Sequence, residues 1–369
     1  MKKKAIPKTP PVFLVKIIMR FVNFLERLPG KILPPQAVLL NHTFKDIAAN
    51  RCVYFAAETG IADILEDGPK PIEQLAEQSG MNADALYRVM RTLTTLGIFK
   101  EKKDRYFETN KAAKFLRHNA ADSMSSFIRI FGQPWLFASW NDLERTVKNG
   151  KDYFENNHEE NLFDWLSKNP RAQKIFDEGM TGASTLSDFP IINAYDFSPF
   201  DTIVDVGGGR GFILGILLDV FPQLRAVLFD LPSTIEAVIA NKIFEKKGFS
   251  ERVECIGGDF FEFIPAGYSA YLLKFILRDW EDKKAARILA NCRKAMRDDS
   301  VLIIVENLAE DKKNKADFSK LLDIALMCAT GGRVRTRNES IKLLEDSGFK
   351  LKRAIPTASI FTILEAVPA

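Results

Sequence analysis

The sequence is poor in the residues that bind metal ions or form disulfides. Only 4 cysteines and 3 histidines occur among its 369 residues, and Cys52, Cys255, Cys292 and Cys328 contain no Cys-x-x-Cys pair. This excludes a disulfide-stabilised scaffold and argues against a zinc site. No group of carboxylates and histidines has metal-ligand spacing either, so we expect an activity that needs no metal. Sparse thiols are typical of a reducing compartment, and we expect a cytoplasmic protein.

The chain also lacks internal repeats, low-complexity segments and a membrane-spanning apolar run. Its most apolar N-terminal stretch, residues 12–25, is interrupted by Lys16 and Arg20 and is too short and too charged to span a bilayer. No small-residue cleavage site follows it, which argues against a signal peptide. Hydrophobic residues make up 46% of the chain and charged residues 27%. These values are typical of globular proteins, and the length predicts about two domains.

Positive charge is concentrated at the N-terminus. Residues 1–35 contain eight lysines and arginines and one glutamate, a local charge of +7. Because the whole chain carries +4, the rest is slightly acidic, which argues against a general nucleic-acid binder. Residues 12–28 predict a basic amphipathic helix closed by Pro29-Gly30. We expect residues 1–35 to form an extension that packs on protein, either its own surface or a partner subunit, with a membrane surface as the less favoured alternative.

Residues 36–118 predict a helical domain that contains a winged helix. A helix from Pro71 turns at Ser79-Gly80, Asn82 can cap a second helix that ends near Leu96, and a hairpin follows around the polar tip 102–104. Residues 119–195 predict a helical linker rich in aromatic side chains.

DNA binding is one interpretation of this winged helix, with residues 83–94 as the recognition helix. Its predicted exposed face places Asp84 beside Arg88 and Arg91, which matches a phosphate lattice poorly. We therefore interpret the domain as an interaction or dimerisation module.

From Asp201 onward, alternating strands and helices predict a doubly wound α/β domain. Residues 202–206 form an apolar strand, a glycine-rich turn follows, and an apolar helix comes next. A second strand ends at Asp230, where a carboxylate can accept hydrogen bonds from a ribose diol. Together, the glycine turn and the acid suggest an adenosyl cofactor.

The spacing of the glycines separates this turn from a dinucleotide-binding one. The G-x-G-x-x-G fingerprint would need a glycine where Phe212 or Leu214 stands. The turn instead contains Gly207, Gly209 and Gly211, and no pyrophosphate has to be accommodated.

Five segments in order resemble the motifs of S-adenosylmethionine-dependent O-methyltransferases, both the plant caffeate type and its bacterial relatives that modify polyketides and other aromatics. They are VDVGGGRG at 204–211, FDLP at 229–232, GDFF at 258–261, LKFILRDWED at 273–282 and GGRVRT at 331–336. The resemblance runs from about Pro35 to the C-terminus. It implies a Rossmann-like methyltransferase domain over 196–369 with a mostly parallel sheet. It also implies that the preceding winged-helix domain forms a homodimer.

The same resemblance implies a binding site for S-adenosylmethionine, with S-adenosylhomocysteine as the product. Its expected residues are Gly207, Gly209 and Gly211 under the methionine part, Asp230 at the ribose, Asp259 and Phe260 at the adenine, and Lys274 and Ser184 on the cofactor side. The strand ends place these groups at the carboxyl edge of the sheet.

The catalytic positions depart from the plant pattern. Arg278 stands where the plant-type enzymes have a histidine base, and Val334 stands where they usually have a glutamate that orients it. Glu306 matches the other orienting acid. Arginine stays protonated and has no acceptor lone pair, so Arg278 cannot be that base. We expect Arg278 to stabilise an oxyanion, and Glu306 or Asp279 to orient it.

An apolar acceptor pocket is expected from aromatic and methionine side chains, which indicates an aromatic or polycyclic hydroxyl compound as substrate. The expected lining residues are Phe127, Phe131, Trp135, Met180 and Met327. His42 is a remote candidate for a replacement base. Two alternatives stay open: an enzyme that binds the cofactor but catalyses a non-methylating reaction, and a winged-helix regulator that senses the cofactor.

Overall fold

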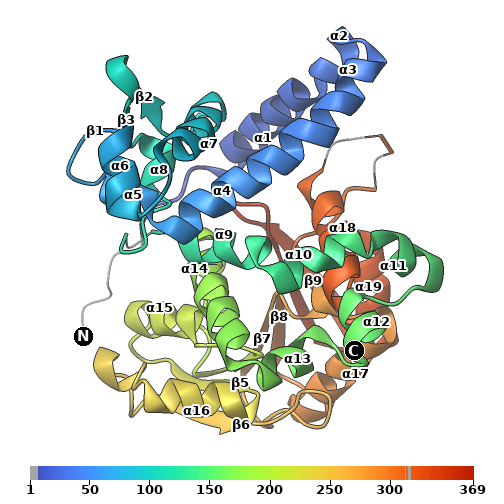
Figure 1. Ribbon diagram of the computed structural model, residues 1–369. Coiled ribbons are helices and arrows are strands. Elements are labelled where there is room, and N and C mark those ends of the chain that lie inside the picture. The colour runs from blue at the N-terminus through green and yellow to red at the C-terminus, as the bar shows by residue number, and fades with distance from the viewer. Residues whose placement is uncertain (1–6, 121, 312, 315–316) are drawn as a thin grey trace. The chain divides into compact units, whose positions relative to one another are not determined.

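The computed structural model describes residues 7–369 except 121, 312, 315 and 316 (Figure 1). The chain forms two compact units. The sheet unit comprises Met1–Asn23, Ser139–Asn169 and Leu186–Ala369, and the helical unit comprises Phe24–Ala138 and Pro170–Thr185. Three helices run from one unit into the other: α1 (Val12–Arg27), α10 (Pro134–Asn141) and α14 (Pro170–Ala194). The domain boundaries predicted from the sequence stay predictions.

A seven-stranded sheet forms the centre of the sheet unit. Its order is β6-β5-β4-β7-β8-β10-β9, and all neighbours are parallel except the pairs that involve β10. The strands are β4 (Thr202–Val206), β5 (Arg225–Asp230), β6 (Val253–Gly257), β7 (Ala270–Lys274), β8 (Val301–Glu306), β9 (Phe349–Pro356) and β10 (Thr362–Pro368). The strand order reverses between β4 and β7. This topological switch point is where open α/β sheets bind ligands.

Helices cover both faces of the sheet (Figure 1). Alternate strand residues point to opposite faces, so Ile203 and Ile303 join one core with α15 and α16, while Val204 and Ile304 join the other with α17 and α19. This arrangement confirms the predicted doubly wound fold. The helices of the unit are α10 (Pro134–Asn141, which begins in the helical unit), α11 (Leu143–Asn149), α12 (Tyr153–His158), α13 (Leu162–Lys168), α15 (Phe212–Val220), α16 (Pro232–Ala240), α17 (Asp282–Ala295), α18 (Phe318–Thr330) and α19 (Arg337–Asp346), with the short turns η3 (Glu245–Lys247) and η4 (Leu277–Asp279).

The helical unit contains the predicted winged helix. The Asn82 side chain accepts a hydrogen bond from the Ala85 N–H at 3.0 Å and caps α7, and β2 pairs with β3 around the polar tip. Its elements are α2 (Pro29–Ile32), α3 (Pro35–Leu40), η1 (Asn41–Asp46), α4 (Ile47–Thr59), α5 (Ile61–Ile64), β1 (Lys70–Pro71), α6 (Ile72–Ser79), α7 (Ala83–Thr95), β2 (Lys100–Glu101), η2 (Lys103–Arg105), β3 (Tyr106–Glu108), α8 (Lys111–Lys114) and α9 (Ser125–Gly132).

The predicted N-terminal helix is confirmed, because α1 ends at Arg27, just before Pro29-Gly30. Pro29 then opens the separate short helix α2. Proline is well tolerated in the first turn of a helix, where its missing N–H has no intrahelical partner to lose. No helix in the described part of the chain combines the length and apolarity needed to cross a membrane.

Candidate active site

The glycine turn after β4 is tied directly to the end of β5. The N–H of Gly209 donates to Asp230 Oδ2 at 2.7 Å, and the N–H of Gly207 donates to the Phe229 carbonyl at 2.8 Å. The Asp230 carboxylate accepts a second hydrogen bond, at Oδ1, from the Leu231 N–H at 2.8 Å. Burial raises the pKa of Asp230, while the backbone donors oppose that shift. The turn and the acid that the sequence singles out therefore lie together at the carboxyl edge of the sheet.

The turn has no room for a side chain at Gly207, Gly208 or Gly211, where a Cβ would lie 2.6 Å or less from another atom. A Cβ on Gly208 would lie 2.5 Å from Asp205 Oδ2 and 2.6 Å from Leu228. A Cβ on Gly207 would lie 2.6 Å from Ile276 and 3.5 Å from the Phe260 ring. The distances of 2.5 and 2.6 Å are shorter than van der Waals contact, whereas 3.5 Å from the Phe260 ring is an ordinary contact. The glycines thus let the backbone pass closely beside Asp205 and Phe260.

Asp259 and Phe260 follow β6 at the same edge. Asp259 Oδ1 accepts a hydrogen bond from the Phe261 N–H at 2.8 Å, and the Phe260 carbonyl accepts one from the Asn291 side chain at 2.9 Å. The Phe260 ring packs edge-on against Phe261 and Trp280. Its orientation is thereby held from two sides.

Two buried carboxylates lie near Lys274, at the end of β7. Lys274 Nζ donates to Asp188 Oδ1 at 2.8 Å, and its charge opposes the large upward shift that burial imposes on the pKa of Asp205, which reaches about 7. The Oδ2 atoms of both Asp188 and Asp205 are buried and have no hydrogen-bond partner among the described residues. Buried carboxylate oxygens without partners are costly, so these two mark a place built for a further donor or cation.

The sequence analysis missed both acids. Asp205 interrupts the apolar strand β4 between Val204 and Val206, and an acid there was a readable signal. Asp188 had no such signal, because its partner Lys274 lies 86 residues away in the sequence.

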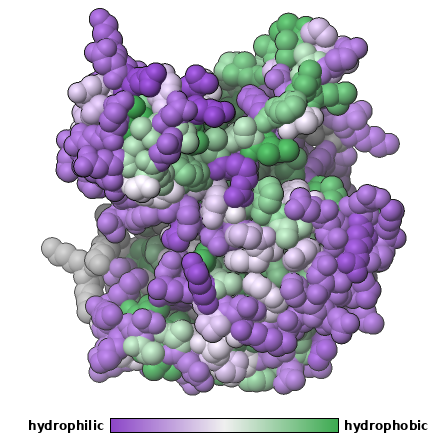
Figure 2. All heavy atoms as spheres, in the orientation of Figure 1, coloured by the Kyte–Doolittle hydropathy of each residue, from purple (hydrophilic) through white to green (hydrophobic). Residues whose placement is uncertain are grey.

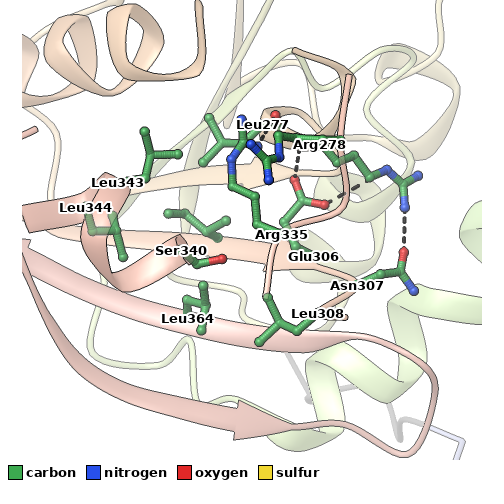
Figure 3. A pocket seen from close by; sticks show the side chains of 12 residues that line it. Leu277, Arg278, Glu306, Asn307, Leu308, Arg335, Ser340, Leu343, Leu344 and Leu364 are labelled. Atoms are coloured by element: carbon green, nitrogen blue, oxygen red, sulfur yellow. Dashed lines mark hydrogen bonds and ion pairs between the residues drawn. The ribbon is translucent and has the colours of Figure 1, made fainter. Parts of the chain in front are cut away.

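Arg278 lies just beyond β7 and faces the end of β8 (Figure 3). Its Nη1 donates to Asn307 Oδ1 at 2.7 Å, and its guanidinium carbon lies 4.3 Å from the centre of the Phe275 ring. Glu306 Oε1 accepts a hydrogen bond from the Arg278 backbone N–H at 3.3 Å, while Glu306 Oε2 lies 3.9 Å from Arg278 Nε. Those last two atoms are buried and have no hydrogen-bond partner within the described residues. Arg278 and Glu306 therefore lie together as predicted, and each keeps one buried polar atom without a hydrogen bond to the described residues.

The acids around Arg278 have altered proton affinities. Burial is the main cause that raises the pKa of Glu306 to about 7, and the nearby Arg278 charge opposes it. Burial likewise raises the pKa of Asp279 to about 6, again against Arg278. Perturbed groups of this kind cluster at functional sites.

Residues 331–335 hold the backbone of Arg278 in place. The Arg333 N–H donates to the Arg278 carbonyl at 2.9 Å. The buried Arg335 guanidinium donates to the Leu277 carbonyl at 2.7 Å (Figure 3) and to the Trp280 carbonyl at 2.9 Å. A Cβ on Gly332 would lie 2.2 Å from the Arg278 carbonyl oxygen. Sequence reasoning did not identify Asn307 or Arg335, because their roles depend on contacts with a turn distant in the chain.

A small cavity of about 20 Å³ opens behind this turn, between α19 and strands β8 and β10 (Figure 3). A cavity needs roughly 10–15 Å³ to hold one water molecule. This one therefore has room for a water and is too small for an aromatic acceptor. Its lining residues include Arg278, Glu306, Asn307, Arg335, Leu343 and Leu364.

The residues expected to line the acceptor pocket are divided between the helical unit and the sheet unit. In the helical unit, Phe127 and Phe131 form an edge-to-face pair at 5.0 Å, and Ser184 Oγ donates to the Met180 carbonyl at 3.2 Å. Trp135 belongs to α10, and in the sheet unit Met327 belongs to α18. Their roles in binding stay predictions.

His42 belongs to η1, where its exposed ring lies 2.8 Å from Asp46. In the part of the chain that the structure describes, no three His, Cys, Asp or Glu side chains form a group that could hold a metal ion.

Family comparisons agree with this arrangement. The family model for an O-methyltransferase domain matches residues 140–350, and the model for an O-methyltransferase dimerisation domain matches residues 41–118. Phenazine O-methyltransferase PhzM of Lysobacter antibioticus is 38% identical over 316 residues, which cover 86% of this chain and 92% of that protein.

Two solved structures extend the similarity to the fold. The crystal structure of LaPhzM has a TM-score of 0.85 and 36% identity, covering 91% of this chain and 100% of the other. NcsB1, an O-methyltransferase from neocarzinostatin biosynthesis, has a TM-score of 0.74 and 26% identity, covering 87% and 96%. That structure contains S-adenosylmethionine and 2-hydroxy-5-methyl naphthoic acid.

Proposed function

Since this chain belongs to the O-methyltransferase family, we propose that it transfers a methyl group from S-adenosylmethionine to a hydroxyl of a small aromatic or polycyclic molecule. The observation that carries this proposal is the glycine turn hydrogen-bonded to Asp230 at the switch point of the sheet. Relatives named for phenazine O-methylation or solved with a naphthoic acid support a fused-ring acceptor.

The residues present suit S-adenosylmethionine. Asp230 can accept hydrogen bonds from the ribose hydroxyls, and Asp259 with Phe260 can bind the adenine through a carboxylate and an aromatic face. The unpartnered oxygens of Asp188 and Asp205 supply negative charge near the glycine turn, which favours a ligand that carries a sulfonium and an ammonium group. Lys274 and Ser184 complete the proposed cofactor side, and when bound the cofactor supplies an electrophilic methyl group.

Arg278 occupies the position of the general base, and we propose that it acts by stabilising the ionised acceptor instead of removing its proton. A positioned base raises a rate by about 10²- to 10⁴-fold, which corresponds to about 3–5 kcal/mol of the activation barrier. Bringing two reactants together can lower the barrier by about 7–11 kcal/mol, which is the larger effect. Methyl transfer therefore tolerates the loss of a histidine, provided that the acceptor ionises. A guanidinium beside the acceptor oxygen stabilises the phenolate and lowers the pKa of the hydroxyl.

Glu306 and Asp279 are then positioning residues. Glu306 accepts the backbone N–H of Arg278 and faces its side chain, so it restrains both ends of this residue. Asp279 is the next residue in the same turn. We further propose that the 41–118 domain forms a homodimer, that Phe127, Phe131, Trp135, Met180 and Met327 line the acceptor pocket, and that nucleic acid is not a partner.

The test is calorimetric titration with S-adenosylmethionine and S-adenosylhomocysteine, followed by mass analysis of products. Asp230→Asn removes a charged acceptor, and such hydrogen bonds contribute about 1.5–3 kcal/mol, so we expect roughly 10- to 100-fold weaker binding. The control Asp298→Asn changes an exposed carboxylate of the same unit and should bind like the wild type. Fused-ring phenols should gain the mass of one methylene group per transfer. Absence of cofactor binding to the folded protein would refute the proposal, and turnover without that mass gain would indicate a non-methylating enzyme.

A further inference from the structure

Helix α1 presents a broad apolar face to solvent. None of its 16 residues is buried, and the exposed fraction reaches 67% for Phe13 and 60% for Phe21. The apolar face consists of Phe13, Leu14, Ile17, Ile18, Phe21, Val22, Phe24 and Leu25. Val12, Val15 and Asn23 are the least exposed residues of α1 and lie on one side of the helix. The apolar face lies on the opposite side.

Apolar exposure continues beyond α1. Ile32 is 69% exposed in α2 and Leu39 69% in α3, and hydrophobic atoms gather over α2 and α3 in Figure 2. Exposed apolar residues in such number mark a binding site for a protein or a membrane. The remaining question is which of the two covers α1.

A cationic stripe borders the apolar face of α1 along one edge. At helical spacing, Lys16, Arg20 and Arg27 lie on one line beside Phe13 and Phe24. Among the described residues, Lys16 and Arg20 have no carboxylate partner. Glu26 is the single acid in the helix.

This charge pattern disfavours a second copy of the chain as the occupant. A two-fold contact between α1 helices would bring two cationic stripes together, with one acid from each copy to compensate. The helix also lies outside residues 41–118, which match the family's dimerisation domain. A wide apolar face beside a row of lysine and arginine is the pattern of helices that lie in the interface of an anionic membrane.

We propose that α1 binds the surface of an anionic lipid bilayer. The apolar face enters the boundary between headgroups and acyl chains, and the cationic stripe pairs with lipid phosphates. The helix lies parallel to the membrane plane, since its length and its charges do not allow it to span. The partner is thus a membrane rich in acidic phospholipid, and the inference is independent of the catalytic proposal.

Vesicle flotation of the full-length protein tests this. We expect flotation with vesicles of phosphatidylcholine and phosphatidylglycerol, weakened by added salt, and at least about tenfold less with phosphatidylcholine alone. Ile17→Ser/Phe21→Ser and Lys16→Gln/Arg20→Gln should each reduce binding about tenfold or more. Ile239→Ser changes an equally exposed apolar residue in α16 and should leave flotation unchanged.

The oligomeric mass of the same variants distinguishes the membrane from a protein partner. Light scattering after gel filtration should give one mass for the wild type and for Ile17→Ser/Phe21→Ser. A lower mass for that variant would assign the face to a subunit contact and overturn the proposal. Flotation that is absent, or equal on neutral and anionic vesicles, would overturn it as well.

Discussion

Arg278 combines a permanent charge with a restrained position. Asn307, Phe275 and Glu306 contact it from three sides, so little reorganisation is needed to stabilise charge on a bound oxygen. We expect Arg278→Ala to lower kcat by about 10²- to 10³-fold, the cost typical of removing one oxyanion donor, with cofactor affinity unchanged. The measurement is steady-state kinetics beside calorimetry.

Arg333→Ala is the matched control, because Arg333 lines the same small cavity but pairs with Asp282 and Glu339. Its kcat should stay within a fewfold of the wild type. Equal losses in the two variants would show that Arg278 has no special role, and a gain of activity in Arg278→His would show that the site still accommodates a base.

Glu306 should make stability depend on pH. Its pKa is about 7 in the folded protein against 4.5 as the ordinary value, so between these values the folded state holds the proton more tightly than the unfolded chain. The free energy of unfolding therefore decreases as the pH rises through this range. Between about pH 5 and pH 8 the loss is on the order of 2 kcal/mol.

Glu306→Gln should remove that loss. Urea unfolding at the two pH values measures it, with the exposed Glu345→Gln in α19 as control. An unchanged pH dependence in Glu306→Gln would mean that this carboxyl is not protonated in the folded state near neutral pH.

The turn between β4 and α15 depends on glycine for two different reasons. Gly208→Ala places a Cβ 2.5 Å from Asp205 Oδ2 and 2.6 Å from Leu228, and such overpacking costs about 1–3 kcal/mol. Gly209→Ala meets no described atom within 4 Å, but its φ of +57° costs a non-glycine residue about 1–2 kcal/mol.

We therefore expect both variants to be destabilised in urea unfolding, and Gly208→Ala to lose more cofactor affinity because it also displaces Asp205. A Gly208→Ala protein that binds the cofactor like the wild type would contradict the packing of this turn.

We expect the active species to be a homodimer of two complete chains. The helical unit contains the segment that matches the dimerisation domain of the family, whereas the glycine turn proposed to bind the cofactor belongs to the sheet unit. We expect light scattering to give twice the chain mass of 41.7 kDa in active fractions. Activity that resides in a monomeric fraction would contradict this.

Local structural features that depend on a few neighbouring residues were predictable from the sequence. The Asn82 cap, the winged-helix hairpin, the glycine turn and the strand ending in Asp230 are each encoded within a few neighbouring residues, because hydrogen bonding and steric limits there act locally. The family motifs made the fold and the family predictable, and the structure and the comparisons confirm both.

The sequence by itself thus determined the α/β order, the family and the presence of Arg278 where the plant-type enzymes have a histidine. Tertiary structure decided what surrounds these residues. Asp188 meets Lys274, Arg335 meets the carbonyls of the 277–280 turn, and Glu306 meets Arg278. Each pair joins parts of the chain separated by 28 to 86 residues. Burial and pairing at such separations depend on how strands and helices assemble, and so do the raised pKa values of Asp205, Asp279 and Glu306.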